Sequence, residues 1–116
     1  MKLNEHAKNT MFTDFDVLKK KSRETNSKGK ATSKMIVYYI IYFVSSRGYL
    51  YIVDFMSAEM KSVLKLHKSA IFSVKISKKH NFFMTGGEDQ MLKIWSLNST
   101  ELLYDFQLES QIRSMA

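Results

Sequence analysis

Cysteine and proline are both absent from the 116-residue sequence. Without cysteine, the chain has no disulfide framework, thiolate zinc site, iron–sulfur cluster or cysteine nucleophile. Histidine is scarce as well, and the three present, His6, His67 and His80, are too dispersed for a histidine-rich metal site. We therefore expect neither a metal nor a cofactor.

Long hydrophobic runs are also missing. Residues 35–44 form an apolar run of ten residues, whereas a membrane-spanning helix needs about 20. Glu5, Asp14 and Asp16 lie where the apolar stretch of a signal peptide would begin. These patterns predict an intracellular protein without membrane association, in the cytoplasm rather than the nucleus.

The net charge of +7 is concentrated in residues 1–34, which contain nine Lys and Arg against four Asp and Glu. This segment lacks a sustained hydrophobic period, so we expect a disordered, flexible basic tail or linker. Within it Phe12, Phe15 and Leu18, three positions apart, allow one short amphipathic element. The basic side chains that could contact RNA, DNA or another anionic surface are Lys19, Lys20, Lys21 and Arg23.

From residue 35 onward, β-branched and aromatic residues come in short runs closed by turn residues, which is typical of an all-β chain. The predicted strands are 37–44, 49–55, 62–66, 71–77, 82–85, 91–96 and 102–108. A shift of 42 residues places Leu50 and Ile52 over Leu92 and Ile94. Four strands in a period of about 42 residues fit a β-propeller blade.

Residues 85–95, Thr-Gly-Gly-Glu-Asp-Gln-Met-Leu-Lys-Ile-Trp, resemble the signature of the WD40 repeat family. That signature is a small hydroxyl residue, small residues, a turn aspartate and an apolar-x-apolar-Trp ending. As in the family, His67 precedes Asp89 by 22 residues and Asp89 precedes Trp95 by six. The resemblance implies a buried hydrogen-bond relay of His67, Thr85, Asp89 and Trp95 that is structural and not catalytic.

Alternative chemistries lack their usual companions in this sequence. His67 and Asp89 could orient Ser69 or Ser73 as a hydrolase nucleophile, but no nucleophile elbow or oxyanion loop accompanies them. The adjacent glycines of the motif lack the following helix that would hold a phosphate. We therefore expect a protein that is not an enzyme.

The resemblance divides the chain into four parts: 1–34 as the tail, 35–66 as a degenerate partial WD40 blade, 67–108 as a WD40 blade, and 109–116 as the start of a further blade. In the degenerate blade, Arg47 takes the position of the turn aspartate and Val53 that of the tryptophan, so the relay cannot form there. Propellers close with about 4–8 blades. The sequence thus predicts an all-β, incomplete WD40-type β-propeller, completed by further blades of the same longer chain, of another copy or of a partner.

The same resemblance implies a non-enzymatic scaffold that binds other proteins or peptides within a larger assembly, with a ciliary or centriolar assembly among the candidates. The turns expected to make these contacts include Lys78, Lys79, His80, Asn98 and Ser99. Nucleic acid is the alternative partner, bound by the basic tail, with tyrosines between lysines as further stacking sites.

Overall fold

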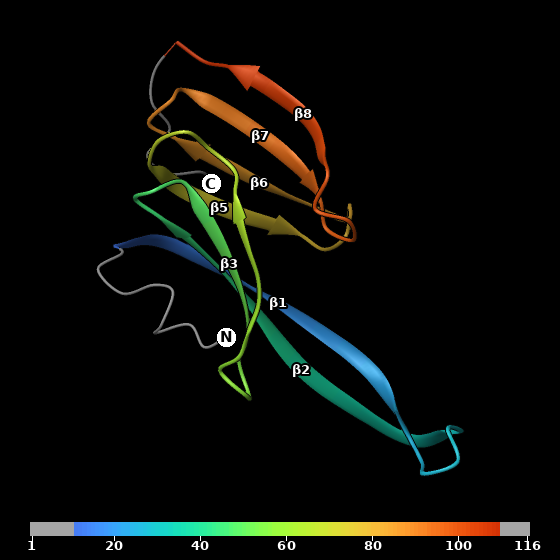
Figure 1. Ribbon diagram of the computed structural model, residues 1–116. Helices are drawn as coiled ribbons and strands as arrows, with labels where there is room; N and C mark the ends of the chain where they lie inside the picture. Colours follow the sequence, from blue (N-terminus) through green and yellow to red (C-terminus); the bar gives the residue numbers. More distant parts are fainter. Residues whose placement is uncertain (1–10, 110–116) are drawn as a thin grey trace.

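A computed structural model describes residues 11–109, which form two four-stranded antiparallel sheets and no helix (Figure 1). The first sheet has the order β1 (Phe12–Thr25), β2 (Ala31–Ser45), β3 (Tyr49–Asp54) and β4 (Met60–Lys65). The second has the order β5 (Ile71–Ser77), β6 (Phe82–Gly87), β7 (Met91–Ser96) and β8 (Leu102–Gln107). Each strand pairs with the next one along the chain, and the prediction of an all-β fold with two blades is confirmed.

The strands from residue 49 onward lie within two residues of their predicted bounds. Runs of β-branched and aromatic residues that are closed by turn residues explain this agreement, since burial alternates along β6 but not along β3 or β8. In β6, for example, Phe83 and Thr85 are buried, whereas Phe82 and Met84 are only half-buried. Such alternation is what a strand between two differently covered faces requires.

The N-terminal segment differs from its prediction. Residues 12–25 are not a flexible tail or a short element of period three, but strand β1, which pairs with β2 from Phe12↔Ser45 to Thr25↔Ala31. The first blade is therefore a complete four-stranded sheet rather than a partial one. Asp14 and Asp16 obscure the apolar alternation of β1 in the sequence, because the N–H groups that they bind lie on the distant strand β5. Residues 1–10 of the expected tail and 110–116 of the expected further blade lie outside the described residues.

A two-stranded arm projects from the first sheet (Figure 1). Strands β1 and β2 have 14 and 15 residues, whereas the other strands have six or seven. Strand β3 pairs with β2 only over Ile40–Val44, so β1 and β2 continue without a third strand beyond that point. We call residues 19–39 the arm.

The core lies between the two sheets. The first sheet contributes Tyr42, Val44 and Leu50, and the second sheet contributes Phe83 and Trp95. The ring of Tyr42 meets the ring of Phe83 edge-on, with centroids 5.2 Å apart. Burying apolar surface on both sheets is the main force that holds them together.

Strand β1, at the edge of the first sheet, also lies beside β5, at the edge of the second, and polar contacts join these two strands. The carboxylate of Asp14 accepts the N–H of Val74 at 3.0 Å, and that of Asp16 accepts the N–H of Ile76 at 2.7 Å. Farther along, Lys78 Nζ donates to the carbonyl of Lys19 at 2.6 Å. The bonded residues advance in the same direction along both strands, so β1 and β5 run parallel. The carboxylates satisfy two N–H groups on the edge of β5.

Replacing Asp16 should weaken this junction. We expect Asp16→Ala to lower the free energy of unfolding by about 1 kcal/mol, because the half-buried N–H of Ile76 loses a charged acceptor. Urea unfolding of the full chain measures the change. Asp105→Ala on the exposed strand β8 is the matched control, with an expected change below about 0.5 kcal/mol. Equal losses in both variants would contradict a specific role for Asp16.

Candidate functional site

Four side chains, from two strands and two connecting segments, meet at the second sheet. His67 lies in the loop between β4 and β5, Thr85 on β6, Asp89 in the turn after β6, and Trp95 on β7. His67 Nδ1 lies 2.9 Å from the nearer carboxylate oxygen of Asp89, and its Nε2 lies 2.7 Å from Thr85 Oγ1. Trp95 Nε1 donates to the same Thr85 oxygen at 2.9 Å. These four residues are the relay that the resemblance implies.

The direction of each bond follows from the chemistry of the partners. A carboxylate only accepts, so His67 Nδ1 carries the proton that it donates to Asp89. Nε2 of the neutral ring is then an acceptor, and the Thr85 hydroxyl donates to it while accepting from Trp95. Protonation of Nε2 would leave the Thr85 hydrogen without its acceptor. The arrangement therefore favours neutral His67.

The electrostatics act in the same direction. Burial lowers the pKa of His67 below its ordinary value, and the hydrogen bond and charge of Asp89 oppose this only in part. The nearby charge of Lys93 lowers the pKa further. Thr85 is fully buried and His67 nearly so, and within residues 11–109 no buried side-chain nitrogen or oxygen lacks a hydrogen-bond partner.

A glycine of the first sheet supports the relay from outside. The carbonyl of Gly48, in the turn between β2 and β3, accepts the N–H groups of Leu66 and His67. Gly48 has φ +85, and a Cβ there would lie 2.2 Å from the carbonyl oxygen of His67. Only glycine permits this close approach. The turn of one sheet thus fixes the backbone of the histidine that organises the other.

The first sheet has no such relay among the described residues. Phe43 takes the register position that Thr85 has in the second sheet, and Val53 takes that of Trp95. The rings of Phe12 and Tyr51 pack against each other at 5.4 Å, and Phe12 lies 5.1 Å from Phe43. Aromatic packing replaces the buried polar network there.

The geometry does not favour the hydrolase alternative. Both ring nitrogens of His67 are engaged, with Asp89 and Thr85, and neither is hydrogen-bonded to Ser69 or Ser73. Within residues 11–109, no group of three or more His, Asp or Glu side chains is arranged to hold a metal ion. The same residues include no helix with the length and hydrophobicity that crossing a membrane requires.

The candidate contact turns lie together, at the end of the sheets from which the arm projects. Lys78, Lys79 and His80 are exposed in the turn between β5 and β6, and Asn98 and Ser99 in the turn between β7 and β8. A backbone hydrogen bond from Leu97 to Asn81 joins these turns. We call this the arm end, and the opposite end, with the turns at residues 45–48, 66–70 and 88–90, the relay end.

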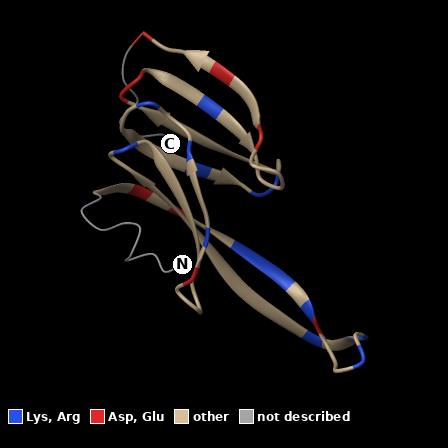
Figure 2. Ribbon diagram, viewed as in Figure 1, with Lys and Arg blue, Asp and Glu red and all other residues tan. Residues whose placement is uncertain are grey.

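The basic residues predicted for a tail lie on the arm instead. Lys19, Lys20, Lys21 and Arg23 are all exposed on β1, and Figure 2 shows their charge along that strand. Between residues 19 and 34 there are seven Lys and Arg and one Glu. The pairing of β1 with β2 therefore presents the basic residues on a folded strand.

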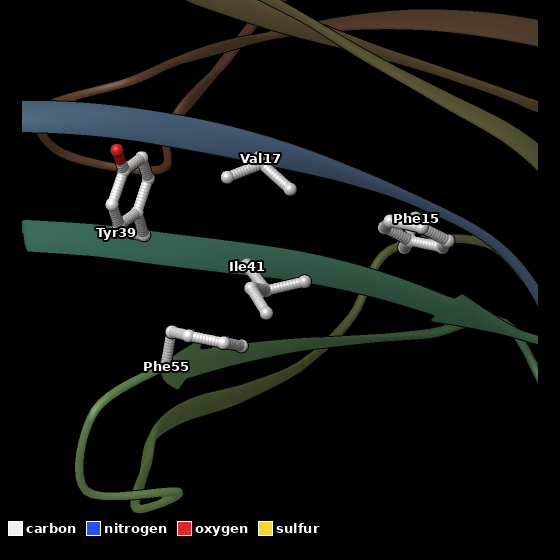
Figure 3. A pocket seen from close by; sticks show the side chains of 5 residues that line it. All are labelled: Phe15, Val17, Tyr39, Ile41 and Phe55. Atoms are coloured by element: carbon white, nitrogen blue, oxygen red, sulfur yellow. The ribbon is translucent and has the colours of Figure 1, made fainter.

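Sequence reasoning missed an apolar groove on the face of the first sheet that points away from the second. Its volume is about 350 Å³ (Figure 3). It is lined by Phe15, Val17, Tyr39, Ile41 and Phe55. Phe15 and Val17 belong to the segment predicted as a tail, and the alternation of these two apolar residues is the signal that could have revealed a strand face.

The family comparison agrees with this geometry. Residues 58–96 match the family described as "WD domain, G-beta repeat", WD40. The chain contains a WD40 repeat. The repeat takes strand β4 from the first sheet and strands β5, β6 and β7 from the second. The sequence repeat is therefore offset from the blade: it begins in the first sheet and ends in the second.

Known proteins resemble this chain over short stretches. Centriole proteome protein 16 of Chlamydomonas reinhardtii is 28% identical over 76 residues, which are 66% of this chain and 4% of that protein. The ribosome biogenesis protein BOP1 homolog of Dictyostelium discoideum is 34% identical over 50 residues, 43% of this chain and 6% of that protein. This chain therefore spans only a small fraction of the length of these relatives.

Among solved structures, the RRP9 WD40 repeats have a TM-score of 0.63 and 14% identity, over 88% of this chain and 28% of that one. At this identity the likeness concerns the fold alone. WD40 β-propeller proteins are typically non-enzymatic scaffolds for protein interactions.

Removing the Thr85 hydroxyl should break the relay at its centre. We expect Thr85→Val to lower the free energy of unfolding by about 2–4 kcal/mol, because His67 and Trp95 each lose a buried partner. Thr85→Ser keeps the hydroxyl and should cost only about 1 kcal/mol for the lost methyl group. Urea unfolding of the two variants measures the difference. A valine variant as stable as the serine variant would show that the hydroxyl contributes nothing.

The lowered pKa of His67 predicts a pH dependence of stability. As the pH falls below about 6.5, unfolded His67 binds a proton while folded His67 remains neutral. The free energy of unfolding should therefore decrease from neutral pH downward, by at most about 1.4 kcal/mol per pH unit from this group, until the folded pKa is reached. Urea unfolding at several pH values measures this slope. His80→Gln should retain it, and stability that rises between pH of about 7 and 6 would contradict the assignment.

Proposed function

We propose that this chain is a non-enzymatic scaffold whose arm end binds other proteins or peptides within a larger intracellular assembly. The observation that carries the proposal is the gathering of exposed polar residues in the two joined turns of the arm end, Lys78, Lys79, His80, Asn98 and Ser99. At the relay end, by contrast, His67 and Asp89 are engaged in the relay.

The open faces of the sheets support the expectation of further blades. The face with the groove corresponds in register to the covered face of the second sheet, since Phe43 and Val53 match Thr85 and Trp95. On the other sheet, Tyr104 and Phe106 on β8 are 63% and 47% exposed. Apolar faces of this extent mark interaction surfaces. We infer that blades of the same longer chain, of another copy or of a partner cover them.

Cytoplasm, nucleus and centriole are the competing locations. The relatives include a centriole protein and a ribosome biogenesis protein by their names. We propose an intracellular assembly as the common setting of this chain, with the cytoplasmic placement as the working hypothesis.

Nucleic-acid binding is the second candidate function, and the arm is the observation that favours it. Seven basic residues against one acidic residue, within residues 19–34, project beyond the sheets (Figure 2). Such density attracts polyanions by charge, with affinity that falls steeply as salt rises. Deleting residues 1–34 would not test this cleanly, because it would remove strand β1.

A pair of matched variants tests the scaffold. Lys79→Glu changes the arm end and Lys68→Glu makes the same change at the relay end, both at exposed turn positions. The tagged full chain is used to capture proteins from source cells, after nuclease treatment, at about 200 mM salt. We expect Lys79→Glu to reduce capture of the wild-type partners several-fold and Lys68→Glu to leave it unchanged. Loss of all capture on nuclease treatment would favour the nucleic-acid function, and equal effects of both variants would contradict binding at the arm end.

A further inference from the structure

The two edges of the arm differ in how they are protected. The edge formed by β1 carries Lys19, Lys20, Lys21 and Arg23, and charged side chains, lysine above all, are what natural sheets use to prevent pairing at an edge. The edge formed by β2 carries an uncharged run, Met35, Ile36, Val37 and Tyr38. The β1 edge of the arm is thus protected against pairing with another strand, and the β2 edge is not.

The unprotected edge continues an edge that is already used. Strand β3 pairs with β2 up to Ile40↔Asp54, and the N–H of Phe55 then donates to the carbonyl of Tyr39 at 3.0 Å. Below that point, no described strand pairs with this side of β2. Met35, Ile36 and Val37 are 50%, 41% and 43% exposed. A two-stranded ribbon of this kind is marginally stable in water, so a further strand would stabilise it.

The backbone directions define what can be added. Because N–H and C=O groups of alternate residues point to the same side, Met35 and Val37 direct theirs to the free edge, as Tyr39 does. A register irregularity between Arg23 and Thr25, opposite residues 31–35, ends the regular edge on its other side. The available edge is therefore short, from residue 35 to residue 38.

We propose that this edge pairs antiparallel with the same edge of a second copy of the chain, about a two-fold axis at Ile36. In this register Met35 of each copy lies opposite Val37 of the other and exchanges two backbone hydrogen bonds with it, while the two Ile36 residues face each other. The arms then form one short four-stranded sheet around residues 35–37, with the apolar β2 strands in the centre and the basic β1 strands outside. Residues 31–33 of each copy leave this sheet at the register irregularity, because Phe55 and Asp54 of the other copy already lie beside Tyr39 and Ile40.

Charge placement favours a second copy as the occupant. Three strand spacings separate the two β1 strands, roughly 14 Å, which exceeds the screening length of about 8 Å at physiological salt. The lysines of the two β1 strands therefore repel each other little, and Lys34, the cation of β2 beside the apolar run, lies opposite the uncharged Tyr38 in this register. A polyanion would instead be attracted to β1 and would leave the apolar residues of β2 in water.

Matched substitutions on the arm test the pairing. Ser22 lies directly opposite Ile36 on β1 and shares its face, so it offers the same local environment one strand farther from the axis. We expect Ile36→Lys to raise the dimer dissociation constant at least about tenfold, since it sets like charges directly opposite each other. Ser22→Lys should change it less than about twofold. Sedimentation equilibrium of the full chain measures both, and an equimolar mixture of Ile36→Lys and Ile36→Glu should form a heterodimer.

The absence of cysteine allows a direct test of the register. Facing residues that exchange no hydrogen bonds have Cα atoms about 4.5 Å apart, within the range that a disulfide spans. Under mild oxidation Ile36→Cys should therefore become a disulfide-linked dimer, and Ser22→Cys should remain largely monomeric. Three results would each overturn the proposal: a chain that stays monomeric, self-association that the two lysine variants change equally, or equal cross-linking of the two cysteine variants. Association that depends on added nucleic acid would overturn it as well.

Discussion

Two carboxylates fix the position of strand β1 at the junction of the two sheets, which the apolar core holds together. Asp14 and Asp16 accept hydrogen bonds from the inner edge of β5 and so hold β1 parallel to it. The rest of the structure depends on that position. With β1 in place the first blade has four strands, its buried face can cover Phe83 and Trp95, and the continuation of β1 and β2 must project as the arm. The charges of Asp14 and Asp16 thus contribute to the packing of the two sheets.

The two blades fill equivalent positions with different chemistry. The second uses a hydroxyl, an imidazole and a carboxylate whose hydrogen bonds are all satisfied, which rigidifies the sheet at the relay end. The first uses aromatic packing around Phe43. The polar groups of the relay are engaged with each other, so His67, Thr85 and Asp89 are not available to a partner, whereas the arm end and the uncovered sheet faces are exposed.

Residues with local signals could be predicted from the sequence. The strands from residue 49 onward follow from runs of β-branched and aromatic residues closed by turn residues, and the relay follows from the resemblance around Asp89 and Trp95. Strand β1 has only one short local signal, the alternation of Phe15 and Val17, because Asp14 and Asp16 become reasonable strand residues only when β5 supplies their donors. The groove likewise depends on the pairing of Val17 with Ile41, which no local pattern encodes. Long-range partners, not propensity, decide these elements.

Amide hydrogen exchange of the full chain, read by mass spectrometry, tests the placement of β1 most directly. If β1 is the strand of the first blade that lies between β2 and β5, amides of residues 13–18 should exchange slowly, at rates close to those of β5. The tip of the arm, residues 26–30, should exchange fast. Exchange throughout residues 12–34 at the rate of an unstructured peptide would contradict this placement. It would also contradict the arm, the complete first blade and the carboxylate junction, since all three require β1.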